Sequence, residues 1–294
     1  MDLITLRAGG AGLVLAPAAG GGVARHWIDD TGRPLDVLRP WTAPGQGDRF
    51  LAAAFPLVPY SNRIRAGRFW FQGRNVTLPL NRPPERHSIH GHGWQVSWTP
   101  LDVSPYEATL EYRHPADSWP WAYRARQRFV LGERSLSLAL SLTNESATAM
   151  PAGLGWHPYF VRTPRTTLTA SVEALWLTDD EVMPTTLSAP PPELDPTRGV
   201  KVDAVALDNC FTGWRRRAVI ERPEEDVRLI MTAEPPLDFL VVYTPPGRPF
   251  FCAEPVSHVT DAFNLAAAGR TDTGMRFLAP GETLRATVSV SVER

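Results

Sequence analysis

The sequence predicts an all-β protein, and three observations support that prediction. Over several segments the apolar side chains recur at every second residue, which is the period of a strand with one buried face. The 294 residues include 29 prolines and 22 glycines, spread along the chain, which leave little room for long helices. No helical apolar pattern extends beyond about three turns. Together these features favour an antiparallel sandwich or barrel of many short strands.

The expected strands alternate apolar and polar side chains. The two clearest are residues 134–144 and 283–292, where leucine, alanine or valine occupies every second position. Residues 166–172, 227–231 and 238–243 are three further candidates. Because each pattern buries one face and exposes the other, these segments are typical of a sheet that covers a core.

The segments between the strands indicate turns and loops within one domain. The glycine-rich segment 9–22 has neither the Gly-Lys-Ser/Thr of a phosphate-binding loop nor the G-x-G-x-x-G spacing, so we expect hairpin turns there. The run of prolines at 190–192 fits a surface loop. We therefore expect a single domain over residues 1–294, with no nucleotide-binding unit.

Composition narrows the choice of partners and compartment. With 30 basic and 31 acidic residues the net charge is −1, which disfavours a nucleic-acid partner or a basic membrane-surface protein. The chain has two distant cysteines, Cys210 and Cys252, no apolar run of 18 residues and no signal-peptide pattern. These features predict a soluble cytoplasmic protein, and they do not indicate its oligomeric state.

Histidines cluster in the first half of the chain, in the segment His87-Ser-Ile-His90-Gly-His92-Gly-Trp94. A cupin-type metal site would require a glutamate three or four residues after the His-x-His pair, and those positions hold Gln95 and Val96. The sequence therefore favours a site without metal. The glycines indicate a sharp turn or a close backbone approach beside an imidazole.

Four other segments combine polar and aromatic residues. Residues 59–68 form a loop with three arginines, whose planar guanidinium groups suit hydroxyl or carboxylate ligands. His157 stands among aromatic residues, where an apolar environment lowers an imidazole pKa. Residues 207–214 place an acidic residue near two aromatics. Glu254 lies between an apolar segment and a proline, where desolvation would raise its pKa and make it a better base.

Taken together, these segments resemble the aldose 1-epimerase (galactose mutarotase) family. The likeness is collinear from Phe55 to about Asn264, roughly two-thirds of the chain. It rests on five motifs in the family's order: Asn62-Arg63-Ile64 with Gly67-Arg68-Phe69, Ile89-His90-Gly91, Trp156-His157-Pro158-Tyr159-Phe160, Leu207-Asp208, and Glu254-Pro255-Val256-Ser257-His258. The resemblance implies a large antiparallel β-sandwich of the galactose mutarotase-like type, with the site in a cleft over one sheet.

The resemblance also implies a reaction and the residues that perform it. The family interconverts the α and β anomers of an aldose, a small-molecule substrate, by opening and closing the sugar ring with one base and one acid. No metal or other cofactor is implied. By resemblance Glu254 is the base at O1, His157 is the acid at O5, and His90 forms a hydrogen bond near O5.

The substrate-binding residues are also implied by the resemblance. Arg63 and Asp208 would hold ring hydroxyls, with Asn62 beside them in the same motif. Trp94 and Trp156 flank the histidine motifs and are candidates for stacking on the sugar. The chain departs from the best-known members at His92, where they carry a glycine, and at Trp156, where their aromatic setting differs.

Three alternatives to a free-aldose epimerase stay open at this point. A hexose-6-phosphate mutarotase would need extra cations, which Arg65, Arg68, Arg74, Arg82 and Arg86 could supply. A non-catalytic sugar-binding module would lack the acid–base pair, and a cupin-like enzyme would hold a metal.

Overall fold

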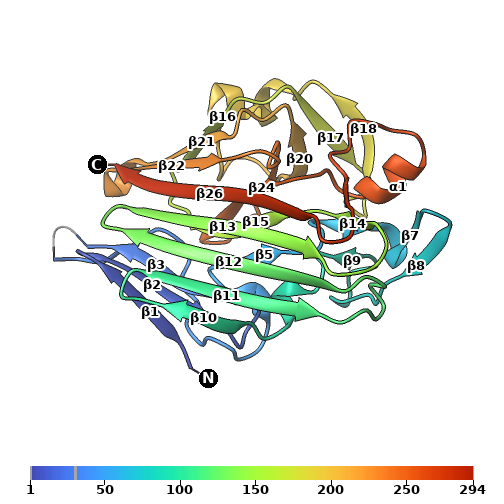
Figure 1. Ribbon diagram of the computed structural model, residues 1–294. Helices are drawn as coiled ribbons and strands as arrows, with labels where there is room; N and C mark the ends of the chain where they lie inside the picture. The colour runs from blue at the N-terminus through green and yellow to red at the C-terminus, as the bar shows by residue number, and fades with distance from the viewer. Residues whose placement is uncertain (1, 30–31, 294) are drawn as a thin grey trace.

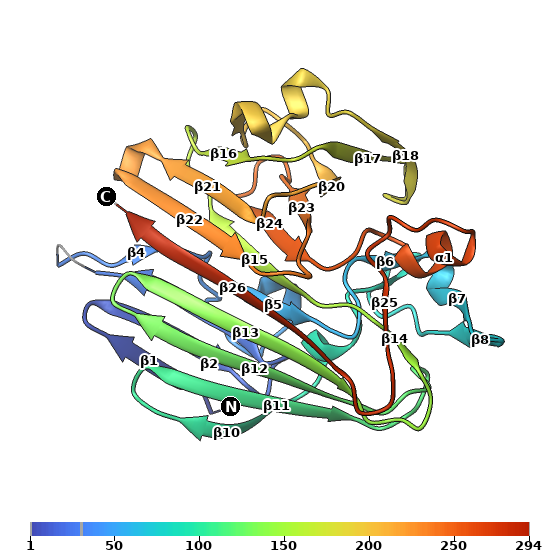
Figure 2. The same cartoon turned by 45° about the horizontal axis from the view of Figure 1, so that its top comes forward.

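The computed structural model describes residues 2–29 and 32–293 and confirms the predicted all-β sandwich (Figure 1). Two large antiparallel sheets form its layers, and Figure 2 shows the sheet with β10–β13 and β26 lying over the sheet with β1–β3, β5 and β15. The core cluster of buried side chains includes residues from both sheets.

The first sheet has eleven strands and carries the candidate site. Its strands are, in spatial order, β1 (Ile4–Ala8), β2 (Ala11–Ala16), β3 (Gly22–Ile28), β5 (Ala54–Leu57), β15 (Gly155–Val161), β24 (Phe250–Val256), β23 (Phe239–Tyr243), β20 (Asp208–Thr212), β17 (Ala174–Thr178) and β18 (Pro184–Ser188), with β4 (Leu35–Asp36) paired to β3. Segments far apart in the sequence are thus neighbours at its centre.

The second sheet has nine strands and contains four of the five predicted ones. Its order is β10 (Thr99–Val103), β11 (Glu107–His114), β12 (Tyr123–Gly132), β13 (Ser135–Asn144), β26 (Thr283–Glu293), β22 (Val227–Ala233), β21 (Arg217–Arg222), β16 (Thr167–Ala170) and β19 (Val200–Lys201). The fifth predicted strand, residues 238–243, is β23 of the first sheet. The ends of the five predicted strands differ from the observed ends by no more than two residues.

The remaining elements are short. Three two-stranded ladders pair β6 (Arg63–Ile64) with β9 (Ser88–Ile89), β7 (Arg68–Phe71) with β8 (Arg74–Thr77), and β14 (Met150–Ala152) with β25 (Arg276–Leu278). Six 3₁₀ turns are η1 (Arg49–Leu51), η2 (Arg65–Gly67), η3 (Gly93–Gln95), η4 (Pro192–Leu194), η5 (Pro196–Arg198) and η6 (Pro223–Glu225). The α-helix α1 (Ala262–Ala267) has six residues, and none of the described helices is long and apolar enough to span a membrane.

Strand β13 shows how the alternating pattern builds the core. Leu136, Leu138, Leu140 and Leu142 are at most 2% exposed, whereas the residues between them are partly exposed. In the ladder with β26, Leu138 lies opposite Val288, so the two apolar faces extend across neighbouring strands. Burying one such side chain contributes about 1.5–3 kcal/mol to folding.

We expect Leu138→Ala to lower the free energy of unfolding by about 2–5 kcal/mol, because it removes buried methyl groups and leaves a cavity. Ser141→Ala, on the partly exposed face of the same strand, should change it by less than about 0.5 kcal/mol. Urea denaturation of both variants measures the difference. Equal losses from the two would contradict this account of the core.

Candidate active site

Six residues predicted for the site, drawn from all five sequence motifs, line one cavity of about 200 Å³, namely Asn62, Arg63, His90, His157, Asp208 and Glu254. The other lining residues are Phe50, Arg82, Glu85, Ile89, Tyr159, Val241 and Tyr243. The side chains of Glu85 and Asp208 are 22% and 29% exposed and mark the mouth, whereas those of His157 and Glu254 are at most 6% exposed and form the floor. The cavity is smaller than most pockets for drug-sized ligands, so it suits a small molecule.

Strand register brings the floor residues together. The pairing of β15 with β24 sets Gly155 opposite Val256 and Tyr159 opposite Cys252, which places His157 beside Glu254. The distance between His157 Nε2 and Glu254 Oε1 is 3.3 Å. The sequence predicts that Glu254 follows an apolar strand. In the structure Glu254 instead lies within that strand, β24.

A second row of side chains faces the same side of the sheet. Asp208 pairs with Tyr243, and Tyr243 pairs with Cys252, which lies opposite Tyr159. Because side chains two residues apart on a strand point the same way, this row lies beside the row of His157 and Glu254. The centre of the sheet therefore supplies both the floor and the Asp208 side of the cavity.

Two loop segments close the other side, through the short ladder of β6 and β9. The backbone N–H of Asn62 donates to His90 Nδ1 at 3.0 Å, and the N–H of His90 donates to the Asn62 carbonyl oxygen at 2.9 Å. Asn62 and His90 have φ values of 55° and 61°, and Gly91 has 65°. A Cβ on Gly91 would lie 2.0 Å from the Val58 carbonyl oxygen, so only glycine fits there.

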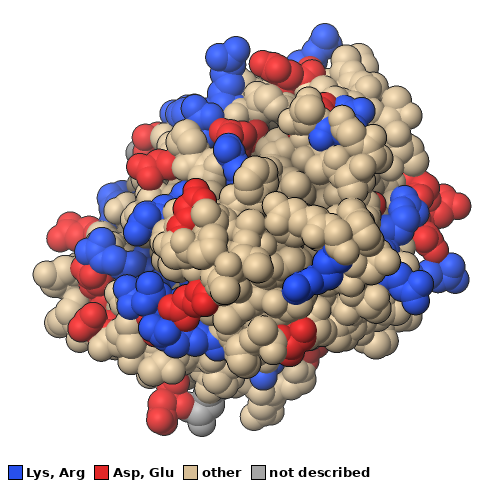
Figure 3. Space-filling model, turned by 45° about the vertical axis from the view of Figure 1, so that its right-hand side comes forward, with Lys and Arg blue, Asp and Glu red and all other residues tan. Residues whose placement is uncertain are grey.

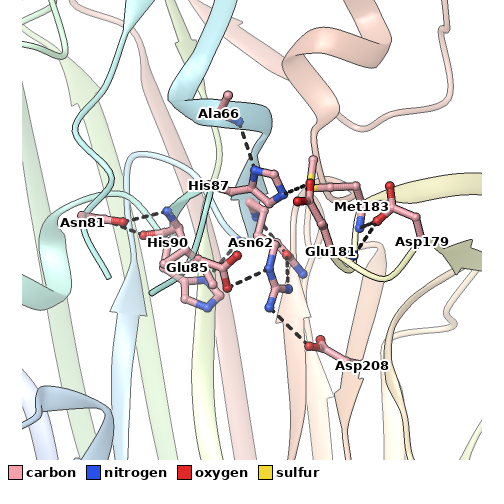
Figure 4. A network of polar contacts seen from close by, with 12 residues as sticks. Asn62, Ala66, Asn81, Glu85, His87, His90, Asp179, Glu181, Met183 and Asp208 are labelled. Carbon is pink, nitrogen blue, oxygen red and sulfur yellow. Dashed lines mark hydrogen bonds and ion pairs between the residues drawn. The ribbon is translucent and has the colours of Figure 1, made fainter. Parts of the chain in front are cut away.

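Arg63 is held between two carboxylates, those of Glu85 and Asp208, which are labelled in Figure 4. Its Nε lies 3.3 Å from Glu85 Oε2, and its terminal nitrogen lies 3.4 Å from Asp208 Oδ2. Sequence analysis missed Glu85, because a glutamate in the run Pro83-Pro84-Glu85-Arg86 has no local pattern that distinguishes it from a solvated turn. Its role depends on the contact with Arg63.

Burial sets the protonation of the floor. It raises the pKa of Glu254 well above its usual value, and the nearby charge of Asp208 adds to that shift while Arg63 opposes it. Burial and the charge of Arg39 lower the pKa of His157 to about 3. Both shifts favour the neutral forms, in which Glu254 carries the proton, and transfer of that proton to His157 would give a carboxylate beside an imidazolium.

His90 is also neutral, because burial and the neighbouring His157 lower its pKa well below the usual value. Since Nδ1 accepts the Asn62 N–H, the ring proton is on Nε2. Burial likewise raises the pKa of Asp208, although Arg63 acts in the opposite direction. The cavity thus offers one fixed N–H donor, one mobile proton and two acidic side chains near Arg63.

A metal ion could be considered at His90, His157 and Glu254, whose potential ligand atoms lie within 4.8 Å of one another. However, Nδ1 of His90 is occupied by the Asn62 N–H and Nε2 carries the proton, so a neutral His90 has no free lone pair for a metal. The two histidines of the His-x-His segment also point to different partners, because His92 Nε2 contacts the Tyr123 hydroxyl at 2.7 Å. This arrangement favours proton transfer over metal binding.

Comparisons with known proteins show the family of this chain. The family model described as aldose 1-epimerase matches residues 2–291. The chain belongs to the aldose 1-epimerase family. It is 35% identical over 282 residues to the uncharacterized protein YphB of Escherichia coli K12, a match that covers 93% of each chain.

Two solved structures have the same fold as this member of the aldose 1-epimerase family. One, from Escherichia coli K12 and provisionally described as an aldose 1-epimerase, has a TM-score of 0.90 and 32% identity over 99% of both chains. The other is a galactose mutarotase-like protein from Clostridium acetobutylicum, with a TM-score of 0.88 and 21% identity over 99% of this chain and 95% of that one.

The aromatic residues around the site differ from the two tryptophans proposed from the sequence. Neither Trp94 nor Trp156 lines the cavity. Trp156 precedes His157 on β15, so its side chain points to the opposite face of the sheet. Trp94 is buried and packs edge-on against Phe50, with ring centroids 4.8 Å apart. In this aldose 1-epimerase family member, Phe50 and Tyr159 supply the aromatic walls instead.

Behind those walls lies Arg39, which no sequence motif identified. Its guanidinium stacks on the ring of Tyr159 at 4.1 Å, and Tyr159 stacks on His157 with centroids 4.6 Å apart. The same guanidinium donates to the carbonyl oxygens of Phe50 and Ala52 at 2.8 and 2.6 Å. Arg39 therefore holds the Phe50 wall and places a positive charge one ring away from His157.

We expect Arg39→Met to shift both limbs of the pH profile of kcat/KM upward by about 0.5–1 pH unit, because the loss of a nearby cation makes each protonated form of the Glu254–His157 pair more stable. Arg39→Lys keeps the charge and should leave the limbs in place, although it loses the planar contacts to Phe50 and Tyr159. Unmoved limbs in the methionine variant would show that Arg39 acts only on packing.

Proposed function

We propose that the protein is an aldose 1-epimerase that interconverts the α and β anomers of a free aldose in the cytoplasm. The observation that carries the proposal is the pairing of Glu254 with His157 at 3.3 Å on the floor of a small cavity. The second carboxylate oxygen of Glu254, Oε2, is buried and has no partner among the described residues. A buried acceptor without a partner is unusual and suits a ligand hydroxyl.

The reaction requires two proton transfers on the sugar. Glu254 takes the proton of the O1 hydroxyl, and His157 gives a proton to the ring oxygen O5. The C1–O5 bond then breaks with its electron pair on O5, and the electrons of the former O1–H bond form the carbonyl at C1. After rotation about C1–C2, the same steps in reverse close the ring on the other face. No electrons are gained or lost.

The number of protons on the neutral Glu254–His157 pair matches this scheme. Ring opening starts from the Glu254 carboxylate and the His157 imidazolium, which together hold the same number of protons as the neutral pair. The His157–Glu254 contact allows a proton to move between them when a sugar binds. The fixed Nε2–H of His90 is suited to donate toward O5 as negative charge develops there.

Arg63, Asp208 and Asn62 are suited to bind the ring hydroxyls. The carboxylate of Asp208 accepts and the guanidinium of Arg63 donates, and a hydrogen bond to a charged group is stronger than one between neutral groups. Asp208 is partly exposed at the mouth, whereas Glu254 and His157 lie on the floor of the cavity, so these side chains are suited to position the ring without joining the proton transfers.

The structure gives little support to a hexose-6-phosphate as the substrate. Of the five arginines considered for a phosphate, only Arg82 lines the cavity, and it already contacts both carboxylate oxygens of Asp48 at 2.8 and 2.7 Å. Arg86 pairs with Glu181 at 2.8 Å, and Arg65 lies near Asp179 and Asp261. The carboxylate of Glu85 at the mouth would repel a phosphate.

A nucleic-acid partner is also not expected. Basic and acidic side chains are intermixed on the face shown in Figure 3, so that face has no continuous basic surface. Polarimetry of a fresh α-anomer distinguishes an active epimerase from a sugar-binding module without activity, because binding alone does not accelerate the change in optical rotation.

We expect Glu254→Gln and His157→Ala each to lower kcat by about 10²–10⁴-fold, because glutamine cannot take the O1 proton and alanine cannot supply the O5 proton. Arg63→Ala should act chiefly on KM, since the hydroxyls it binds change little in charge during ring opening. Polarimetry across a panel of fresh α-aldoses measures all three. A Glu254→Gln enzyme with near wild-type kcat would place the base elsewhere.

We expect a free aldose to be converted with a kcat/KM at least about tenfold higher than that of its 6-phosphate, because the mouth offers the phosphate an acidic side chain and arginines that are already paired. Glu85→Gln should narrow this ratio by removing the repulsion. Polarimetry on matched pairs, such as glucose and glucose 6-phosphate, gives the two rates. A preference for the phosphate would favour the sugar-phosphate alternative.

A further inference from the structure

A second cavity of about 210 Å³ lies on the other side of the segment that carries His90. Ile89 and His90 line the first cavity, whereas Ser88, Gly91 and His92 line the second. We call this second space the rear cavity and define it by six of its lining residues, Asn81, Ser88, His92, Tyr112, His114 and Asp117. None of them takes part in the proposed reaction.

The lining of the rear cavity is aromatic and polar, as is usual for sites that bind small polar ligands. The rings of His92 and His114 lie with centroids 4.2 Å apart, and His114 stacks on Tyr123 at 4.8 Å. His114 and Ser88 are at most 3% exposed, whereas Asp117 is exposed and marks the opening. A cavity with this many polar groups is not a packing defect of the core.

The hydrogen bonds fix which groups can accept from a ligand. The carbonyl oxygen of Trp119 lies 3.2 Å from His114 Nε2, so that nitrogen carries the ring proton. His114 Nδ1 then accepts the hydroxyl proton of Tyr112, also at 3.2 Å, which leaves the Tyr112 oxygen as an acceptor. The carboxylate of Asp117 is a second acceptor through Oδ2. Its Oδ1 lies 3.2 Å from His114 Nε2 and accepts the Trp119 N–H at 2.9 Å and the Ser118 hydroxyl at 3.2 Å.

His92 adds a further polar atom. Its Nε2 contacts the Tyr123 hydroxyl at 2.7 Å, and in the described part of the chain Nδ1 has no hydrogen-bond partner. Burial lowers the pKa of His92 to about 3, and burial also lowers the pKa of His114, so both rings are neutral. Among the described residues that line the rear cavity, Asp117 is the only acidic one, and none is a lysine or an arginine.

We propose that the rear cavity binds a second small, neutral polyhydroxyl molecule, of the size of one monosaccharide. Its volume nearly equals that of the first cavity. The acceptors Tyr112 and Asp117 suit hydroxyl donors, and the aromatic lining suits the C–H groups of a sugar. The single negative charge disfavours anions such as sugar phosphates.

A ligand in the rear cavity would contact the segment that positions His90. The Asn81 amide donates to the carbonyl oxygens of Ile89 and Gly91 at 2.8 Å, and its oxygen accepts the Ile89 N–H at 2.8 Å. The backbone N–H of His92 donates to the Val58 carbonyl oxygen at 3.1 Å. The two cavities therefore share a wall, and a test must report on each of them separately.

Histidine-ring NMR resonances of the full chain provide that test, because His90 and His157 report on the first cavity and His92 and His114 on the rear one. The probe is a methyl aldopyranoside, whose O1 has no proton, so it binds without being converted. We expect two titrations with different midpoints. Tyr112→Phe and Asp117→Asn should each weaken the rear titration about tenfold, the usual effect of one lost hydrogen bond to a ligand, without moving the first midpoint.

Three controls separate the outcomes. Arg63→Ala should weaken only the titration of His90 and His157, and Tyr106→Phe, a change at an exposed tyrosine outside the rear cavity, should alter neither. The matching sugar 6-phosphate should leave His92 and His114 unmoved. The proposal is overturned if the His92 and His114 resonances do not shift at saturating methyl aldopyranoside. It is also overturned if they titrate with the same midpoint as His90 and His157 and respond to Arg63→Ala, or if they shift with the sugar 6-phosphate. Its failure leaves the polarimetric test of epimerase activity unaffected.

Discussion

The antiparallel pairing of β15 with β24 is the constraint on which the site depends. It sets His157 beside Glu254, and the pairing of β15 with β5 sets Phe55 on the other side of the same ring. A register shift of one residue would turn His157 to the opposite face and bring Trp156 and Pro158 to the cavity. The apolar residues of β15 and β24 resist such a shift, because it would expose Phe160 or Phe251, both fully buried.

Burial of the acid–base pair has a cost and a chemical use. Taking Glu254 and His157 out of water disfavours their charged forms, which is why burial is the largest cause of both pKa shifts. When the proton is on Glu254, both Glu254 and His157 are neutral, so the pair does not hold two buried charges. The same low-dielectric surroundings strengthen the electrostatic interaction between the pair and any charge that develops on a bound ring.

The three histidines of the histidine-rich segment contact different parts of the protein. His90 is held by the backbone of Asn62 and faces the first cavity, His87 Nδ1 accepts the Ala66 N–H, and His92 contacts Tyr123 of the second sheet. Figure 4 shows His87 and His90 pointing to different neighbours. The positive φ values of His90 and Gly91 produce the sharp turn that separates their directions. Three histidines in six residues therefore do not form one cluster.

The sequence by itself determined the fold class and six of the lining residues. Period-two segments such as β13 and β26 are visible without a structure, because alternation follows from burying one face of a strand. The motifs around Asn62, His90, His157, Asp208 and Glu254 were recognisable because each combines rare residue types within a few positions.

Only the tertiary structure decided the rest of the site. Glu85 and Arg39 join the site through contacts with residues more than ten positions away, and Trp94 and Trp156 are excluded from it by the direction of their side chains. Such contacts depend on how separate strands and loops meet in space, which local sequence patterns do not specify.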